Sequence, residues 1–268
     1  MQILKLILLL SACFLFILWS KKERTLQVVF ISGCNEYVSH SSLQQYKADL
    51  EKKYSNIRIT LLQADGPLNK KQEYSNLNGT DALKNCDLLL VFARRTTISG
   101  KAIEDIRKYL NAGKPIVALR TSSHGFESWP AFDKEILGGN YSNHFGGEPE
   151  KRVMGADGMY YAVGEPKGPV QNVIVNPANK NHPVLAGVKN FISKYSLYKT
   201  SPIADDAELL LSGKTIEGKE PVAWTRNHNN GRVVYIGLGG IQDWTNTDFV
   251  KLVTNALFWA ADFKPKKK

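Results

Sequence analysis

The sequence predicts an α/β fold, a flavodoxin-like three-layer sandwich around a mostly parallel central sheet. Over residues 27–119, short apolar segments alternate with amphipathic helical segments, which is the pattern of βαβ units. Residues 116–119 form an unbroken apolar run, as expected of a central parallel strand covered on both faces. Because crossovers between parallel strands are right-handed, few topologies fit this order, and the flavodoxin-like one is the simplest.

Four strands and two helices are expected in the first half of the chain. The strands are predicted over residues 27–32, 57–62, 88–92 and 115–119. The first helix begins at a cap formed by Ser41 or Ser42 and runs through Tyr54, with its apolar side chains on one face. The second helix is capped by Ser99 and stops at Gly113, since glycine commonly ends a helix.

The rest of the chain is less regular. Residues 64–80 are polar and are expected to form a long surface loop. Residues 126–167 are rich in glycine, asparagine and aromatic residues, and predict an irregular insertion over the carboxyl edge of the sheet, with a short helix at 131–137. Gly231 favours a hairpin turn between the last two strands. Further strands are predicted over residues 170–175, 207–211, 221–225 and 232–236, and a final amphipathic helix over 249–260.

The N-terminus predicts a signal peptide or membrane anchor over residues 1–24. Leu6 to Trp19 is apolar apart from Ser11, although it is short for a spanning helix, which needs roughly 20 residues. No small-x-small cleavage site precedes Lys21, so retention as an anchor is expected, with secretion after cleavage as the alternative. An exported or cell-envelope domain over residues 25–263 and a basic tail over 264–268 complete the expected organisation.

The charge and cysteine content of the chain limit the classes of binding partner and the cysteine chemistry that we expect. Much of the net charge of +10 lies at the two ends of the chain, which favours solvated tails first and binding to nucleic acid or an anionic membrane second. No basic stripe interleaved with aromatic residues lies inside the domain, so a nucleic-acid partner is not expected. Cys34 and Cys86 each lie beside a predicted strand and are expected to be small buried residues, with their pairing left open.

Polar side chains follow the predicted strands, where open α/β sheets bind their ligands. The strand at 115–119 leads into a turn that contains Arg120, Thr121 and His124, but neither a cysteine nor a Gly-x-Ser-x-Gly elbow. Arg95 ends the preceding strand, where a guanidinium could hold a hydroxyl-rich or carboxylate ligand by forked hydrogen bonds. Asp243 follows the last strand and is expected to reach the same rim.

Three of the five histidines follow strand ends or lie in the insertion over them. His40, His124 and His144 are therefore expected to face one rim, where imidazoles act as general acid and base or bind a metal. His182, before a proline, favours a turn role, and His228 favours a solvated hairpin tip. The candidate catalytic residues are thus His124 and His144, and the candidate substrate-binding residues are His40, Arg95, Arg120, Thr121, Asn143 and Asp243.

Six segments in succession resemble the trehalose-utilisation (ThuA-like) family, which has the class I glutamine-amidotransferase-like fold. They are residues 119–126, 132–144, 182–188, 221–226, 231–239 and 255–261. The resemblance implies a link to sugar metabolism, including oxidised (3-keto) disaccharides, and a cleft containing His40, His124 and His144. Many relatives carry histidine in a Leu-Gly-His sequence after the last strand, whereas this chain has Gly240 there. Amidotransferases keep a nucleophilic cysteine where this chain has Arg120 or Thr121, so glutaminase activity is not expected.

Two functional hypotheses follow. The first is an enzyme acting on a small-molecule carbohydrate without a cysteine nucleophile, as a hydrolase, lyase or isomerase, with a divalent metal left open as its cofactor. The second is a non-catalytic, envelope-anchored sugar-binding or scaffold domain. Homo-oligomerisation is left open in both.

Overall fold

The computed structural model describes residues 24–146, 151–154, 160–163 and 168–268. The predicted signal peptide or anchor lies outside these residues, apart from Arg24. Among the described residues, no helix is long and apolar enough to cross a membrane.

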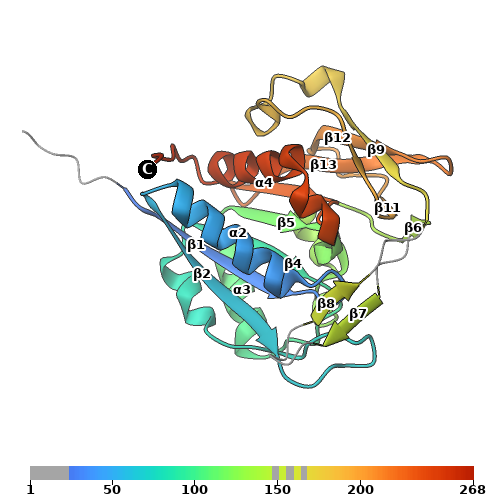
Figure 1. Ribbon diagram of the computed structural model, residues 1–268. Coiled ribbons are helices and arrows are strands. Elements are labelled where there is room, and N and C mark those ends of the chain that lie inside the picture. The colour runs from blue at the N-terminus through green and yellow to red at the C-terminus, as the bar shows by residue number, and fades with distance from the viewer. Residues whose placement is uncertain (1–23, 147–150, 155–159, 164–167) are drawn as a thin grey trace, which may run out of the picture.

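One ten-stranded sheet forms the centre of the domain, in the order β10-β9-β12-β13-β14-β5-β4-β1-β2-β3 (Figure 1). Its parallel part consists of β1 (Leu26–Gly33), β2 (Ile57–Asp65), β4 (Leu88–Ala93), β5 (Ile116–Leu119) and β14 (Gly231–Ile236). Its antiparallel strands are β3 (Asn76–Leu77), β9 (Gln171–Val175), β10 (Phe191–Ser193), β12 (Glu208–Lys214) and β13 (Lys219–His228). The predicted α/β fold is confirmed, with a parallel core and antiparallel additions at both edges.

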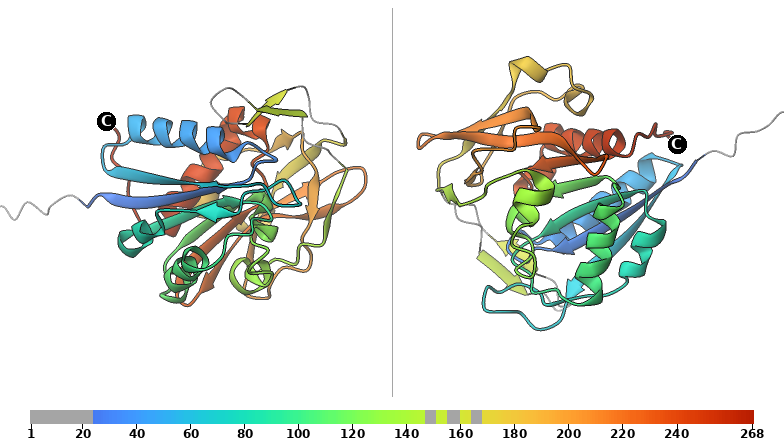
Figure 2. Two further views of the ribbon diagram at one scale, coloured as in Figure 1. Left: turned by 90° about the horizontal axis from the view of Figure 1, so that it is seen from below. Right: turned by 180° about the vertical axis from the view of Figure 1, so that it is seen from behind.

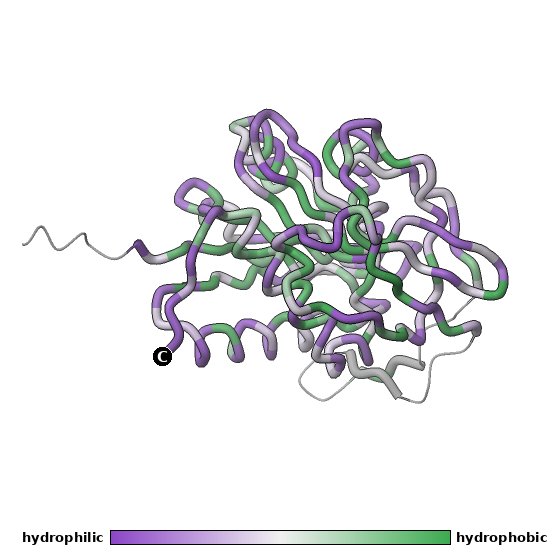
Figure 3. Tube along the Cα trace, turned by 90° about the horizontal axis from the view of Figure 1, so that it is seen from above, coloured by the Kyte–Doolittle hydropathy of each residue, from purple (hydrophilic) through white to green (hydrophobic). Residues whose placement is uncertain are grey.

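Helices cover both faces of the parallel core and complete the three layers. Helices α2 (Ser39–Lys53) and α4 (Thr247–Ala260) lie on one face, where the Tyr46 hydroxyl is 2.9 Å from that of Thr254 (Figure 1). Helix α3 (Lys101–Asn111) and the 3-10 helix η1 (Thr80–Asn85) lie on the other face, as the view from behind in Figure 2 shows. Each face has its own buried apolar cluster, and apolar segments concentrate in the central strands in Figure 3.

The helix starts differ from the predicted caps. Helix α2 begins at Ser39 after Val38, whose φ of 45° is left-handed, and the Ser41 hydroxyl donates back to the Val38 carbonyl at 3.0 Å. Helix α3 follows Gly100, and the predicted Ser99 cap is wrong because glycine takes the cap position with a positive φ of 58°. At both helix starts, a residue with a positive φ therefore takes the cap position, and no side chain caps the helix.

Two predicted loops also differ. Within residues 64–80, β3 pairs with β2 and the Glu73 side chain is fully buried, so this segment is not simply a surface loop. The hairpin between β13 and β14 turns at Asn229 and Asn230, whose φ values are 48° and 68°, while Gly231 already belongs to β14. Gly231 is needed for a close approach instead, because a Cβ there would lie 2.7 Å from the backbone of Gly113.

The insertion after β5 lies at the carboxyl end of the parallel strands (Figures 1 and 2). The short helix expected in it is present as a π-helix, η3 (Asp133–Leu137). Strand β6 (Asn143–Phe145) pairs with β11 (Leu197–Lys199), and β7 (Lys151–Met154) pairs with β8 (Tyr160–Val163). Four further short helices complete the fold, η2 (Arg120–His124), η4 (Pro177–Asn179), η5 (Pro183–Leu185) and η6 (Ile241–Thr245).

The basic tail is part of the folded domain. The backbone N–H of Ser55 donates to the Lys266 carbonyl at 2.9 Å, and the Lys268 N–H donates to the Lys53 carbonyl at 3.0 Å. Tyr54 and Lys267 form an antiparallel bridge between these bonds. Residues 264–268 thus extend along the end of α2, where a freely solvated tail was expected.

Candidate active site

The carboxyl ends of β1, β4 and β5 converge at the point where the strand order reverses, between β1 and β4. Arg95 follows β4 and Arg120 follows β5, and both adopt left-handed backbone conformations, with φ values of 43° and 41°. Such conformations are costly for residues other than glycine and concentrate at functional sites. The turns that carry the candidate side chains are therefore held in place by their surroundings.

Arg120 occupies the sharp strand-to-helix turn at which elbow-type enzymes place a nucleophile. Its side chain is fully buried and donates to the Tyr37 hydroxyl at 3.0 Å, to the Ser196 hydroxyl at 3.0 Å and to the Gly237 carbonyl at 3.3 Å. None of its hydrogen-bond partners among the described residues is a carboxylate. Arg120 was expected to contact substrate, but its burial leaves it to act on the site through its charge.

Tyrosine rings surround this buried guanidinium. Its central carbon lies 4.4 Å from the ring centroid of Tyr37, 4.7 Å from that of Tyr198 and 5.3 Å from that of Tyr195. The electron-rich faces of aromatic rings stabilise a cation, and more strongly where water is excluded. Tyr198 and Tyr195 lie far from the strand ends in sequence, and no pattern in the sequence singled them out.

His124 ends η2 beside this cluster. Its ring stacks on Tyr141, with centroids 4.1 Å apart and planes 20° from parallel, and Tyr198 lies 5.6 Å away on a tilted plane. Burial holds the pKa of His124 well below its usual 6.5, and the positive charges of Arg95, Arg94 and Arg120 lower it further. The imidazole is therefore neutral at neutral pH.

The Ser123 hydroxyl contacts one ring nitrogen of His124. The Ser123 hydroxyl donates to the Arg120 carbonyl at 3.4 Å and lies 3.1 Å from His124 Nδ1. When that hydroxyl donates to the carbonyl, Nδ1 carries the proton and donates to Ser123, and the lone pair is then on Nε2. Nε2 has no hydrogen-bond partner within the described part of the chain, so it can accept a proton from a ligand.

A pocket of about 520 Å³ opens beside His124 and is lined by Arg95, Tyr141 and the turn around η3. Its exposed lining residues include four polar ones, Glu127, Lys134, Asn140 and Ser142, beside the apolar Pro130 and Ala131. This volume falls within the range of small-molecule sites, and polar side chains on the wall suit a ligand with many hydroxyl groups.

Asp133 is a member of this pocket that sequence reasoning missed. Its Oδ2 accepts the Tyr141 backbone N–H at 2.8 Å, while Oδ1 is buried without a hydrogen-bond partner. Burial raises the pKa of Asp133 to about 6, so the group exchanges protons near neutral pH. Its position in one of the six matching segments was a signal, but burial of this carboxyl could not be read from the sequence.

Three expected site residues serve the fold instead of the pocket. Both ring nitrogens of His40 are used internally, at 2.7 Å from the Ser32 hydroxyl and 2.9 Å from the Ala64 carbonyl. Asp243 accepts the backbone N–H groups of Gly239 and Gly240 at 3.0 and 2.9 Å and so caps the start of η6. Thr121 is fully buried against the Cys34 thiol. None of the three lines the pocket.

His144 and Asn143 lie near the site without lining the pocket. Both are exposed residues of β6, and His144 Nδ1 donates to the Gly146 carbonyl at 3.0 Å. The His144 ring lies 6.2 Å from that of Tyr198, which also contacts His124. Asn143 Oδ1 accepts the His144 backbone N–H at 2.9 Å. Of the predicted residues, the structure therefore brings together Arg95, Arg120 and His124, with His144 at the margin.

A second ionic cluster supports this end of the sheet. Arg94 forms ion pairs with Glu36 and, at 3.1 Å, with the buried Glu73. Glu73 also accepts the Asn35 backbone N–H at 2.7 Å, which ties the loop before β3 to the end of β1. Burial raises the pKa of Glu73 to about 7 despite these partners. Arg94 is thereby fixed close enough to His124 to lower the pKa of the imidazole.

Tyr195 occupies the space beside Gly240, the position at which many relatives are expected to carry histidine. A Cβ on Gly240 would lie 2.1 Å from the Tyr195 ring. The Tyr195 hydroxyl accepts the backbone N–H of Gln242 at 2.8 Å and is held there. The departure from the family pattern is thus matched by a specific packing partner.

The described residues contain neither a cluster of metal-ligating side chains nor an exposed cysteine. Across residues 24–146, 151–154, 160–163 and 168–268, no three His, Cys, Asp or Glu side chains gather as a metal site. Cys34 and Cys86 are buried free thiols, as expected, and burial raises the pKa of both. A bound divalent metal therefore stays a prediction, and the described residues offer no set of ligands for it.

Comparison with known proteins assigns the family. The family model for trehalose utilisation, ThuA, matches residues 27–260. The chain belongs to the ThuA family. A search of curated proteins gives no match.

Solved structures share this ThuA-like fold. A ThuA-like protein from Parabacteroides merdae is similar with a TM-score of 0.62 and 17% identity, over 91% of this chain and 93% of that one. One from Bacteroides uniformis gives 0.60 and 17%, over 90% and 93%. A β-galactosidase from Bacillus circulans gives 0.52 and 12%, over 90% of this chain but 32% of that one. At these identities the likeness shows the fold alone.

Proposed function

We propose that this ThuA-family protein binds a sugar in the pocket beside His124 and transfers a proton next to a carbonyl group of an oxidised, 3-keto sugar. The observation that carries the proposal is the neutral imidazole of His124, which has a free Nε2 and lies among guanidinium groups at the edge of a pocket of about 520 Å³. The family name supports a sugar as the ligand.

The proposed proton transfer follows from the charged and titratable groups around the pocket. Nε2 of His124 takes a proton from the carbon next to the carbonyl, and the electron pair of the broken C–H bond moves onto the carbonyl oxygen. Positive charge from Arg95, at the pocket wall, stabilises the resulting enolate oxygen. Asp133, whose pKa is raised to about 6, is the second proton-exchanging group of the pocket and can return a proton to the intermediate. No cysteine nucleophile takes part.

A non-catalytic sugar-binding domain is the second candidate, and one observation favours it. Tyr195 fills the place beside Gly240, and His40 is tied to backbone and serine, so two of the histidines implied by the family are absent or unavailable. A binder would use the same pocket but would leave the C–H bonds of the sugar intact.

Solvent deuterium exchange distinguishes the enzyme from the non-catalytic sugar-binding domain. Protein in D2O with 3-keto and unoxidised disaccharides is followed by NMR for loss of the C–H signal next to the carbonyl, together with the melting temperature. If the protein is an enzyme, it exchanges the C–H proton next to the carbonyl of the 3-keto sugar for deuterium. That exchange should fall by orders of magnitude in His124→Ala, whereas His228→Ala, in the β13–β14 hairpin, should retain it. A raised melting temperature with no exchange establishes the binder instead. Neither exchange nor a thermal shift with any sugar refutes both.

A further inference from the structure

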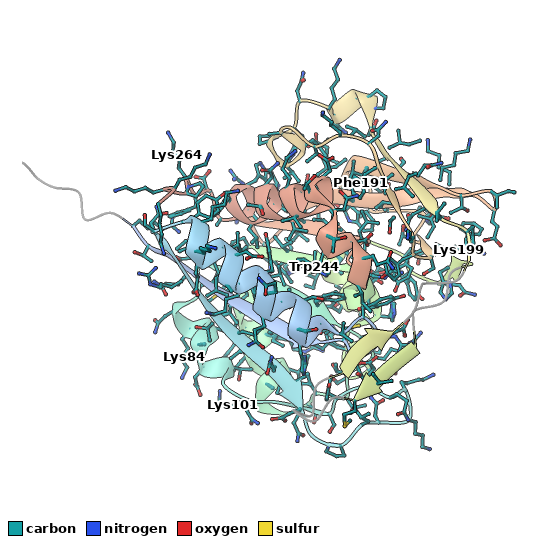
Figure 4. All side chains as sticks on the ribbon, in the orientation of Figure 1. Lys84, Lys101, Phe191, Lys199, Trp244 and Lys264 are labelled. Atoms are coloured by element: carbon teal, nitrogen blue, oxygen red, sulfur yellow. The ribbon has the colours of Figure 1, made fainter. Side chains whose placement is uncertain are left out.

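The chain enters and leaves the domain at the same end of the molecule. The start of β1 and residues 264–268 both lie at the amino ends of the parallel strands, as Figure 1 shows, and Lys264 projects outward there in Figure 4. The guanidinium carbon of Arg24 lies 5.7 Å from the ring centroid of Phe263, so the residues before β1 and after α4 are in contact. His124 and its pocket follow the opposite, carboxyl ends of the strands.

Basic side chains gather at this end. We call them the tail face, which consists of the exposed residues Arg24, Lys52, Lys53, Arg58, Lys264, Lys266, Lys267 and Lys268. These eight basic residues outnumber the acidic residues beside them, which include Asp87, paired with Arg24 at 3.3 Å, and Asp262, paired with Arg232 at 3.3 Å. The tail face therefore carries a strong net positive charge.

The fold holds these charges in place. Besides the bridge between Tyr54 and Lys267, the Lys266 backbone N–H donates to Asn56 Oδ1 at 2.7 Å, and Lys268 Nζ donates to the Glu51 carbonyl at 2.7 Å. Charges fixed on one side of a domain act together on a flat, oppositely charged surface, which charges on a freely moving tail do less effectively.

The apolar segment Leu6–Trp19 joins the domain at this same face. Five peptide steps separate Trp19 from Arg24, and even a fully extended chain covers only about 18 Å over that length. Wherever the apolar segment enters a bilayer, Arg24 of the tail face is therefore held within about 18 Å of Trp19, roughly two Debye lengths at physiological ionic strength.

We propose that the tail face binds the anionic surface of a phospholipid membrane. Lysine and arginine side chains close to such a surface are attracted to acidic headgroups, and the attraction is screened by salt. Strand β1, with eight residues, spans about 26 Å, so this arrangement directs the pocket beside His124 away from the membrane and toward solvent. The inference is independent of the chemistry proposed for that pocket.

Vesicle binding of the full chain tests the proposal. Vesicles of phosphatidylcholine alone and of equimolar phosphatidylcholine and phosphatidylglycerol are compared at low and high ionic strength. The quadruple variant K264Q/K266Q/K267Q/K268Q removes half of the tail face. The matched control, K180Q/K189Q/K214Q/K219Q, removes four exposed lysines elsewhere on the domain. Circular dichroism verifies that both variants are folded.

We expect the native protein and the control to bind the anionic vesicles at least tenfold more tightly than the neutral ones at low salt, with the preference lost at high salt. The tail-face variant should lose most of that preference. Amine labelling of bound protein should also show Lys264 and Lys266–Lys268 protected only on anionic vesicles. Equal binding to both vesicles, an equal loss in the control, or labelling unchanged by anionic lipid would overturn the proposal.

Discussion

The imidazole of His124 lies face to face with the phenol ring of Tyr141, at a centroid distance of 4.1 Å. The two residues come from different turns, one directly after β5 and the other from the insertion before β6. Asp133 holds the Tyr141 backbone through its Oδ2, so the short helix η3 sets the position of the ring that covers His124. Burial of the imidazole, and with it the low pKa, therefore depends on the insertion.

Replacing Tyr141 tests this dependence. In Tyr141→Ala, water reaches the imidazole, and the pKa of His124 should rise toward 6.5 because burial is the largest cause of its depression. Sugar affinity should fall about fivefold, as expected when a stacking ring worth about 1 kcal/mol is lost. An NMR titration of the histidine ring protons measures the pKa. Tyr141→Phe keeps the ring and should keep the low pKa; an unchanged pKa in the alanine variant would contradict the account.

Arg95 offers a test of the electrostatic contribution. Arg95→Gln removes the positive charge that, after burial, most lowers the pKa of His124, so that pKa should rise, and by less than in Tyr141→Ala. Stability should change by less than about 1 kcal/mol, because the 3.4 Å pair of Arg95 with Glu127 is partly exposed. Arg58→Gln removes a charge at the other end of the sheet and serves as the control. An equal shift in both variants would show that the effect is not local.

Gly240 and Tyr195 should be energetically coupled. Gly240→Ala places a Cβ into the Tyr195 ring and should destabilise the protein by about 1–3 kcal/mol, the usual cost of overpacking. Tyr195→Leu alone also destabilises, because it removes a buried ring. Together, the two substitutions should cost at least about 1 kcal/mol less than the sum of the single costs. Urea denaturation of the native protein, the two single variants and the double variant measures the four free energies of unfolding. If the two single costs simply add, the ring does not exclude a side chain at position 240.

Glu73 should make stability pH-dependent. Its pKa is about 7 in the folded protein against 4.5 as the ordinary value, so the folded state binds the extra proton. This contribution is fully present below pH 4.5 and is lost as the pH rises to about 7, at a total of about 3 kcal/mol. Glu73→Gln cannot lose a proton. The stability of the native protein relative to Glu73→Gln should therefore fall between pH 5 and 8 in urea denaturation, and curves that stay parallel would disprove the assignment.

Much of the fold was accessible from local patterns. Each predicted strand coincides with an observed strand and starts within two residues of it, although three of them end three residues early; the apolar runs that bury these segments are contiguous in the sequence. Strands β3, β6, β7, β8, β10 and β11 were not predicted, since two to four residues are too few to show a periodicity. The helix caps failed for a related reason. Val38 and Gly100 replace serine through backbone angles that composition does not reveal.

The candidate site was only partly predictable. The ends of β4 and β5 identified Arg95, Arg120 and His124, because parallel strands bring their carboxyl ends to one edge. His40 and Asp243 were assigned to the same edge, but neighbouring carbonyl, hydroxyl and amide groups satisfy them there.

The sequence by itself determined the α/β class, the order of the core strands and the absence of a cysteine at the elbow, because these depend on periodicity and on residue identity at strand ends. Only the tertiary structure decided which polar groups are buried. Asp133, Glu73 and the tyrosines around Arg120 acquire their environment from segments far away in the chain. Desolvation by those segments, and not the local sequence, sets the pKa values of the carboxyl and imidazole groups at this end of the sheet.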